Sequence, residues 1–183
     1  MTDRHEIDEP VELVPHNPKW PEWFLKEKIS LEKTLGDDAK AIEHIGSTAI
    51  SNIWAKPIVD ILIGVGADLL SKEKRQSLIG LGYKYYGEAN ITWRLYFTKR
   101  GQRNFNLAVV SWGGPLWHSN ILFRDYLKCH PDESRRYEKS KKTIVKKGSL
   151  HLFEYSDRKK PIISKLMKNA EKWSSQQLPL LEA

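Results

Sequence analysis

One segment limits what this 183-residue chain can fold into more than any other. Residues 58–65 read IVDILIGV, a run of β-branched and other apolar side chains that is typical of a strand buried within a sheet. Its one acidic residue is Asp60. Because an ionised carboxylate inside an apolar strand is costly unless it is paired, we expect Asp60 to have a function or a polar partner.

Apolar spacing on both sides of this strand predicts the other elements. It indicates helices over 21–35, 68–81, 116–130, 132–147 and 161–173, and Pro21 and Pro161 suit the first helical position. Further strands are predicted over 41–45, 91–98 and 103–110, and the turn at 99–102 joins the last two as a hairpin. This order of elements predicts an α+β fold, in which a small mixed β-sheet is packed with helices.

The composition fits one globular domain that attracts anions. We expect a flexible N-terminal arm over residues 1–12, a single domain over 13–173 and a polar tail over 174–183. Lys and Arg number 30 against 23 Asp and Glu, and the net charge of +7 favours phosphate-bearing partners. The single cysteine, Cys129, excludes an internal disulfide and a cysteine-rich zinc site. The polar N-terminus and the lack of a long apolar run predict a cytoplasmic protein with no membrane partner, while the oligomeric state stays open.

The stretch before the buried strand carries a pattern that suits a phosphate. Gly46 lets the backbone approach a ligand closely, and Ser47 and the N–H groups after it, such as that of Thr48, can donate hydrogen bonds to phosphate oxygens. Asp60 on the following strand can then hold Mg²⁺ against the same phosphates. The structural alternative is a turn with a helix cap at Gly46 and Ser47, and a hydrogen-bonded buried acid at Asp60.

Two blocks of this sequence resemble the GrpB family. The first joins GSTAI at residues 46–50 to AKPIVDI at 55–61, and the second is FRDYLK at 123–128 followed by HP at 130–131. The resemblance covers roughly residues 13–173 and implies the polymerase β-like fold of the nucleotidyltransferase superfamily. In active members of that superfamily the Gly-Ser pair holds a triphosphate. Carboxylates at positions i and i+2 of the next strand, with a third from a later strand, hold two Mg²⁺ ions there.

The sequence departs from that pattern of carboxylates. Asp60 fills the first position, but the second is Leu62, and no Asp or Glu lies between residues 89 and 124 to supply the third. Asn106 and Ala108 stand where family members often show His-x-His. This departure disfavours a two-metal site, whereas one carboxylate and substrate phosphates can together bind a single Mg²⁺ on Asp60.

Basic and polar residues near this region can hold an anion without a metal, since Arg binds phosphate with two parallel hydrogen bonds. We predict Asp60 and Ser47 as catalytic residues, with Asp60 as the Mg²⁺ ligand. The predicted substrate-binding residues are His44, Gly46, Ser47, Thr48, Lys56, Arg94, Arg103, Asn106 and Arg124. The alternatives are solvated charges on the hairpin, a packed strand histidine at His44, and a structural ion pair that involves Asp125.

Three functions are compatible with these residues. The first is transfer of a nucleotidyl group, with a nucleotide or another phosphorylated small molecule as ligand and Mg²⁺ on Asp60. The second is a binding module that uses the same cleft without chemistry and without a metal. The third is an RNA-binding or protein-binding adaptor that uses the basic run at residues 135–147, although such runs are more often solvated helix faces.

Overall fold

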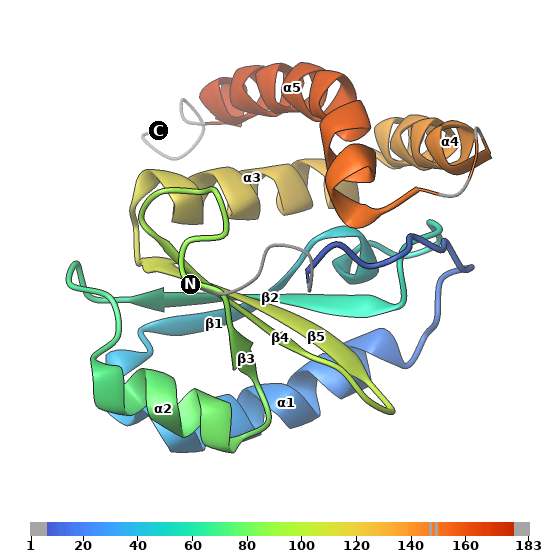
Figure 1. Cartoon of the computed structure of the whole chain (residues 1–183). Coiled ribbons are helices and arrows are strands. Elements are labelled where there is room, and N and C mark those ends of the chain that lie inside the picture. Colours follow the sequence, from blue (N-terminus) through green and yellow to red (C-terminus); the bar gives the residue numbers. More distant parts are fainter. Residues whose placement is uncertain (1–6, 147, 149, 178–183) are drawn as a thin grey trace.

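The computed structural model describes residues 7–146, 148 and 150–177. Its centre is a five-stranded mixed sheet, which confirms the predicted α+β fold (Figure 1). The strands are β1 (Ala41–Ile45), β2 (Ile58–Val65), β3 (Lys84–Tyr85), β4 (Arg94–Lys99) and β5 (Asn104–Ser111), in the spatial order β1-β2-β5-β4-β3. The pair β2–β5 is parallel and the other pairs are antiparallel. Strand β2 pairs with β1 on one side and β5 on the other, so it lies inside the sheet, as its apolar sequence predicted.

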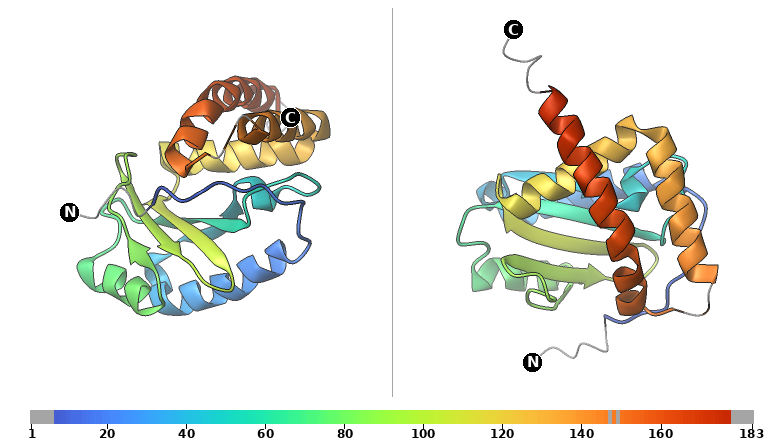
Figure 2. Two further views of the ribbon diagram at one scale, coloured as in Figure 1. Left: turned by 45° about the vertical axis from the view of Figure 1, so that its right-hand side comes forward. Right: turned by 90° about the horizontal axis from the view of Figure 1, so that it is seen from above.

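Helices cover both faces of this sheet. In Figure 1, α1 (Trp20–Leu35) and α2 (Lys72–Gly80) lie below it, and α3 (Pro115–Cys129), α4 (Pro131–Lys146) and α5 (Leu152–Gln177) lie above it. The view from above in Figure 2 shows α5 crossing the sheet, with α3 and α4 on its two sides. None of the helices in the described residues is long and apolar enough to cross a membrane.

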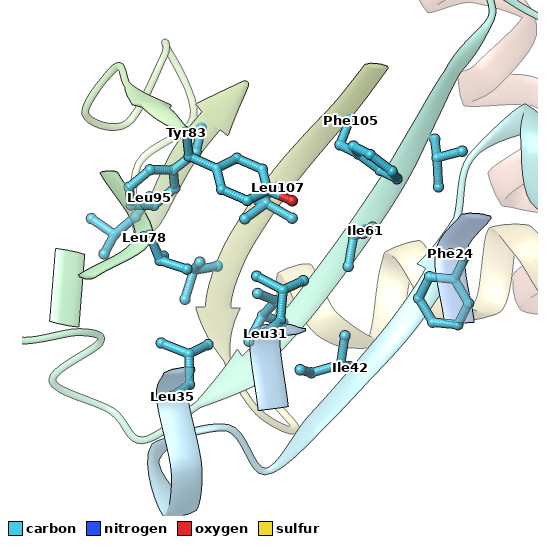
Figure 3. Close-up of a cluster of buried hydrophobic side chains, with 14 of the residues drawn as sticks. Phe24, Leu31, Leu35, Ile42, Ile61, Leu78, Tyr83, Leu95, Phe105 and Leu107 are labelled. Carbon is cyan, nitrogen blue, oxygen red and sulfur yellow. The ribbon is translucent and has the colours of Figure 1, made fainter. Parts of the chain in front are cut away.

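The alternation of side chains along β2 separates the two faces. Ile61 points into the large core beneath the sheet, which also contains Leu31 and Leu35 of α1 (Figure 3). Ile63 belongs to the same buried cluster. Asp60 and Leu62 have the opposite parity, and Leu62 packs with Trp117 of α3 in the upper layer. Asp60 therefore faces the helical layer formed by α3, α4 and α5.

The structure moves the starts of three predicted elements, since α2 begins at Lys72 and not at residue 68, β4 at Arg94 and not at residue 91, and α5 before Pro161. Helix α5 begins at Leu152, so Pro161 lies inside it and does not start it. A proline in a helix removes one backbone hydrogen bond, but burial of Tyr155 in the turns before it holds this first part of the helix in place. The short strand β3 was not predicted, because two residues are too few to show an alternating pattern.

The N-terminal strap, which we define as residues 7–15, connects the layers. Residues 7–12 were expected to form a flexible arm, but Ile7 and Val11 are buried. The Val11 N–H donates to the Leu150 carbonyl over 2.8 Å, and the strap continues to an antiparallel bridge between Val14 and Ala55. These apolar and backbone contacts order the strap. Residues 1–6 of the expected arm, and residues 178–183 of the expected tail, lie outside the described residues.

Candidate functional site

The carboxylate of Asp60 has a polar partner on the neighbouring strand. The parallel register places Asp60 beside Asn106, whose side-chain amide donates to Asp60 Oδ1 over 2.7 Å. The Asn106 oxygen in turn accepts a hydrogen bond from Arg100 Nη2 over 2.9 Å. Asn106 is only 7% exposed, so the amide at the centre of this chain of hydrogen bonds is buried. It fixes the orientation of both carboxylate and amide.

The bend at Gly46 and Ser47 lies directly against this carboxylate. Gly46 has a φ of 69°, and a Cβ atom placed on it would come within 2.4 Å of Asp60 Oδ2. Only glycine tolerates both the backbone angle and the close approach. Two residues that are distant in sequence therefore converge, as the sequence interpretation of Gly46, Ser47 and Asp60 required.

Lys141 reaches the same bend from α4. Its amino group donates to Ser47 Oγ over 3.0 Å and to the backbone carbonyl of Trp54, and it lies 4.7 Å from the centre of the Tyr137 ring. The residue is 1% exposed. Burial lowers the pKa of Lys141 to about 7, and the positive charge of Lys159 lowers it further.

Two further lysines approach Asp60 from other elements. Lys56 precedes β2, and Lys159 lies on α5 with its amino group 4.5 Å from the centre of the Tyr155 ring. Burial lowers the pKa of Lys56 to about 8 and also lowers that of Lys159, while the Asp60 charge opposes both shifts. Among the described residues, neither amino group has a hydrogen-bond acceptor. We call Lys56, Lys141 and Lys159 the lysine cluster.

Positive charge exceeds negative charge around Asp60. Three lysines and Arg100 face the single carboxylate of Asp60, and the strap contributes one more acid, Glu9, which binds Arg100 with both oxygens at 2.9 Å. Buried cations in excess of anions are costly, since each loses hydration that the protein only partly replaces. An added anion would offset this cost.

The residues present do not fit a Mg²⁺ site. Among the residues that the structure describes, no group of three or more His, Cys, Asp or Glu side chains is placed to hold a metal ion. Leu62 and Ala108 offer no oxygen on their side chains, one oxygen of Asp60 accepts from Asn106, and the neighbours are cations. Mg²⁺ prefers several oxygen ligands, so the donor set is unsuitable.

Other predicted residues lie near the bend but serve to pack it. His44 stacks on Phe24 with ring centres 5.0 Å apart, and its Nε2 lies 2.9 Å from the hydroxyl of Thr48, which is 1% exposed. Burial lowers the pKa of His44 to about 4, with smaller effects from Lys128 and Arg124, so the imidazole is neutral at pH 7. His44 and Thr48 therefore hold the bend against α1.

The predicted arginines do not join the lysine cluster. Arg124 is paired with Glu43 at 2.5 Å and Asp125 at 2.7 Å, which ties α3 to β1. Arg94 donates to the backbone carbonyls of residues 88 and 89 and covers the Tyr96 ring. Arg103 is exposed and lies over Trp23 of α1. Each of the three has a structural partner.

Sequence reasoning missed Lys141, Lys159 and Arg100. The structure buries Ser134, Tyr137 and Lys141, which follow one another at intervals of three and four along α4. That spacing marks one stripe of the helix, so Lys141 takes the place of an apolar residue. This signal was available within the basic run, but a run of charges is more often a solvated helix face, and Arg135, Arg136, Lys139 and Lys146 are indeed exposed.

Fold and site together define an α+β protein with a cation-rich cluster on the face of its sheet that α3, α4 and α5 cover. The profile of the family described as "GrpB protein" matches residues 10–169. This chain belongs to the GrpB family.

Individual relatives agree with this assignment. The "UPF0157 protein YqkA" of Bacillus subtilis is 35% identical over 164 residues, which are 89% of this chain and 48% of YqkA. The "Glutamate-rich protein GrpB" of Alkalihalophilus pseudofirmus is 35% identical over 161 residues, covering 85% of this chain and 92% of that protein. The chain thus spans about half the length of YqkA.

A solved structure has the same fold. The crystal structure of conserved protein GrpB from Enterococcus faecalis superposes with a TM-score of 0.77 at 27% sequence identity. The match covers 89% of this chain and 99% of the other.

Proposed function

We propose that this protein binds the phosphate group of a nucleotide or another phosphorylated small molecule, and that it does so without a metal ion. The observation that carries the proposal is the lysine cluster. Three lysines from three separate elements converge on Asp60, and the amino groups of Lys56 and Lys159 keep their hydrogen-bond donors free within the described structure.

A phosphate dianion matches this arrangement in charge and in hydrogen bonding. Each ammonium group offers three donors, and phosphate oxygens accept charge-assisted hydrogen bonds that are roughly twice as strong as neutral ones. Lys56 and Lys159 are half-buried, which leaves part of each side chain accessible from solvent. The negative charge of the ligand would neutralise the positive charge that Asp60 and Glu9 do not offset.

The alternative is nucleotidyl transfer with one Mg²⁺ on Asp60. Its support is the close approach of the Gly46–Ser47 bend to Asp60, which is the arrangement the family resemblance implies. The lysine cluster favours metal-free binding, and so does the lack, within the described residues, of any group of three or more His, Cys, Asp or Glu side chains that could hold a metal ion. The two functions predict opposite roles for Asp60. In the metal-dependent function its negative charge attracts Mg²⁺ and so favours binding, whereas in the metal-free function the same charge repels the phosphate.

The adaptor function is less well supported. On α4, Arg135 is paired with Asp132, Arg136 with Glu133 and Lys142 with Glu138, so much of the basic run is neutralised within the helix. Nucleic-acid binding relies on cations that are free to replace counterions.

A thermal-shift screen tests the proposal. Inorganic phosphate, pyrophosphate and nucleotides are each added with EDTA or with Mg²⁺, to wild type and to Asp60→Asn, which keeps an acceptor for Asn106. A ligand at about 100 times its Kd adds roughly 2.7 kcal/mol of stability. We expect stabilisation in EDTA that Asp60→Asn retains or increases. Stabilisation that needs Mg²⁺ and disappears in Asp60→Asn would establish the metal-dependent alternative.

A further inference from the structure

The contact between Ser47 and Lys141 has a chemical use that anion binding does not require. Lys141 Nζ lies 3.0 Å from Ser47 Oγ, and the carbonyl of Trp54 accepts a second hydrogen bond from the same nitrogen. Helix α4 holds the lysine with its side chain enclosed, while Ser47 itself is half-buried. A hydroxyl within hydrogen-bond reach of a fixed amine is the arrangement of a nucleophile and its base.

The surroundings of Lys141 suit the neutral amine. A neutral amine can donate one N–H to the Trp54 carbonyl and accept the Ser47 hydroxyl proton on its lone pair, so both protein contacts persist without charge. Several charged groups act on Lys141 besides burial. Lys159 of α5 and Lys142 of α4 favour the neutral form, and Glu138 of α4 and Asp60 of β2 favour the charged form.

The phenol of Tyr137 is the remaining titratable neighbour. Its ring faces the Lys141 amino group at 4.7 Å. Burial raises the pKa of Tyr137 to about 12, although a side-chain hydrogen bond with Ser47 lowers it, so the phenol is uncharged at neutral pH. The net result of these groups is a pKa of about 7 for Lys141, which leaves a large neutral fraction at neutral pH.

We propose that Ser47 is a nucleophile toward phosphorus centres and that Lys141 is its general base. In the step, the Ser47 oxygen forms a bond to phosphorus while the bond from phosphorus to the leaving group breaks. The hydroxyl proton moves to Lys141 Nζ, and the leaving group departs with the bonding electron pair. Lys56 and Lys159 would offset the negative charge on the phosphoryl oxygens. The inference rests on the proposed function only for the binding of a phosphorylated ligand beside Ser47.

A fluorophosphonate probe tests the step directly, since Ser47 would displace fluoride from phosphorus. Intact-mass measurement follows labelling with time, and peptide mapping locates the adduct. We expect one adduct, on Ser47, and a labelling rate that rises with pH through about 7 and then levels, because Lys141 acts as base when neutral. Ser47→Ala should remove the adduct. Ser51→Ala, at an exposed serine four residues away, should label as wild type.

The base is tested by two replacements at residue 141. Lys141→Met removes the amine but suits a buried position, and Lys141→Arg keeps a charge but supplies no base at neutral pH. Loss of a general base costs about 10²-fold or more in rate, so we expect that reduction in both variants. Circular dichroism shows whether each variant is folded. Peptide mapping of the wild-type protein tests Ser47 even if a variant does not fold. Absence of the Ser47 adduct in wild type, or labelling of a folded Lys141→Met at the wild-type rate, would overturn the proposal.

The outcomes separate the nucleophile from the binding site. If phosphate and pyrophosphate stabilise the protein in EDTA but Ser47 stays unlabelled, the site binds anions and the nucleophile inference is wrong. If Ser47 is labelled but no phosphorylated ligand stabilises the protein, the metal-free binding proposal fails while the reactive serine stands.

Discussion

At the scale of single residues, the chemistry of the site depends on which group binds the Asp60 carboxylate. Asn106 stands where members of the GrpB family often show a histidine, and it provides an amide donor to Asp60. An amide donor stabilises a carboxylate, whereas a metal would compete for the same oxygen. One residue type at position 106 thus changes what the neighbouring acid can do.

The close approach of Gly46 to Asp60 gives a prediction about stability. Replacing Gly46 with Ala introduces a Cβ atom 2.4 Å from Asp60 Oδ2 and places it on a backbone with a φ of 69°. We expect Gly46→Ala to lower the free energy of unfolding by about 2 kcal/mol or more, measured by urea denaturation. Gly101→Ala is the control, because a Cβ there meets nothing within 4 Å. Equal stabilities for the two variants would contradict the packing described for the bend.

The buried His44 gives a prediction about pH. Its folded-state pKa is about 4, below the ordinary 6.5, so the unfolded chain binds a proton that the native state does not. The contribution of neutral His44 is fully present above pH 6.5 and is lost as the pH falls toward 4. We expect the unfolding free energies of wild type and His44→Gln to converge over that range. A constant difference between them in urea titrations at several pH values would show that His44 is not buried as a neutral group.

At the scale of elements, α4 and the strap determine the electrostatics of the site. Helix α4 inserts Lys141 on its buried stripe. The strap carries Glu9 to Arg100, whose Nη2 group donates to both Glu9 and Asn106. The strap therefore pairs the Glu9 carboxylate with Arg100, the cation next to the proposed ligand. Figure 1 shows the strap, in dark blue, entering between the sheet and the upper helices.

Removal of the Glu9 charge gives a test of this arrangement. Glu9→Gln frees Arg100 from a competing carboxylate and lowers the negative potential at Lys56. We expect phosphate or pyrophosphate to bind several-fold more tightly, with at most about 1 kcal/mol of stability lost, since the ion pair is partly exposed. Glu12→Gln, at an exposed residue of the same strap, is the matched control and should bind as wild type. An unchanged affinity in Glu9→Gln would mean that the strap does not influence the site.

Most of the fold could be predicted from the sequence, because it follows local patterns. The apolar run of β2, the alternation in the hairpin and the helix breaks at Gly36 and Pro131 each identify an element. The convergence of Gly46 with Asp60 was also predictable, through the family resemblance. Lys141 and Lys159 could not be placed, since their approach to Asp60 depends on how α4 and α5 pack over the sheet, and a sequence does not contain that information locally.

At the scale of the whole molecule, the sheet and its two helical layers bring together charges from distant parts of the chain. Lys56 comes from the loop before β2, Lys141 from α4 and Lys159 from α5. Packing of these elements buries Lys141, leaves Lys56 and Lys159 half-buried, and lowers the pKa of each. The fold thus holds a cation cluster where its superfamily resemblance suggested metal ions.

The lowered lysine pKa values give a prediction about ligand binding. An anion favours the protonated amine of Lys56, so its affinity should fall as Lys56 loses its proton above a pH of about 8. Calorimetric titration of pyrophosphate in EDTA between pH 6.5 and 9.5 should show weaker binding at the higher pH, with uptake of protons near pH 8. Affinity that rises or stays constant with pH would contradict a lysine-based site.

The most direct test of the account compares pyrophosphate affinity in wild type and in two variants of α5, all in EDTA. Lys159→Met removes a cation from the lysine cluster, and Lys165→Met removes an exposed cation from the same helix. We predict that Lys159→Met weakens binding at least about 10-fold, as expected for loss of a charge-assisted contact, while Lys165→Met binds as wild type. Equal affinities in all three proteins, or no binding until Mg²⁺ is added, would contradict the claim that lysines rather than metal ions hold the ligand.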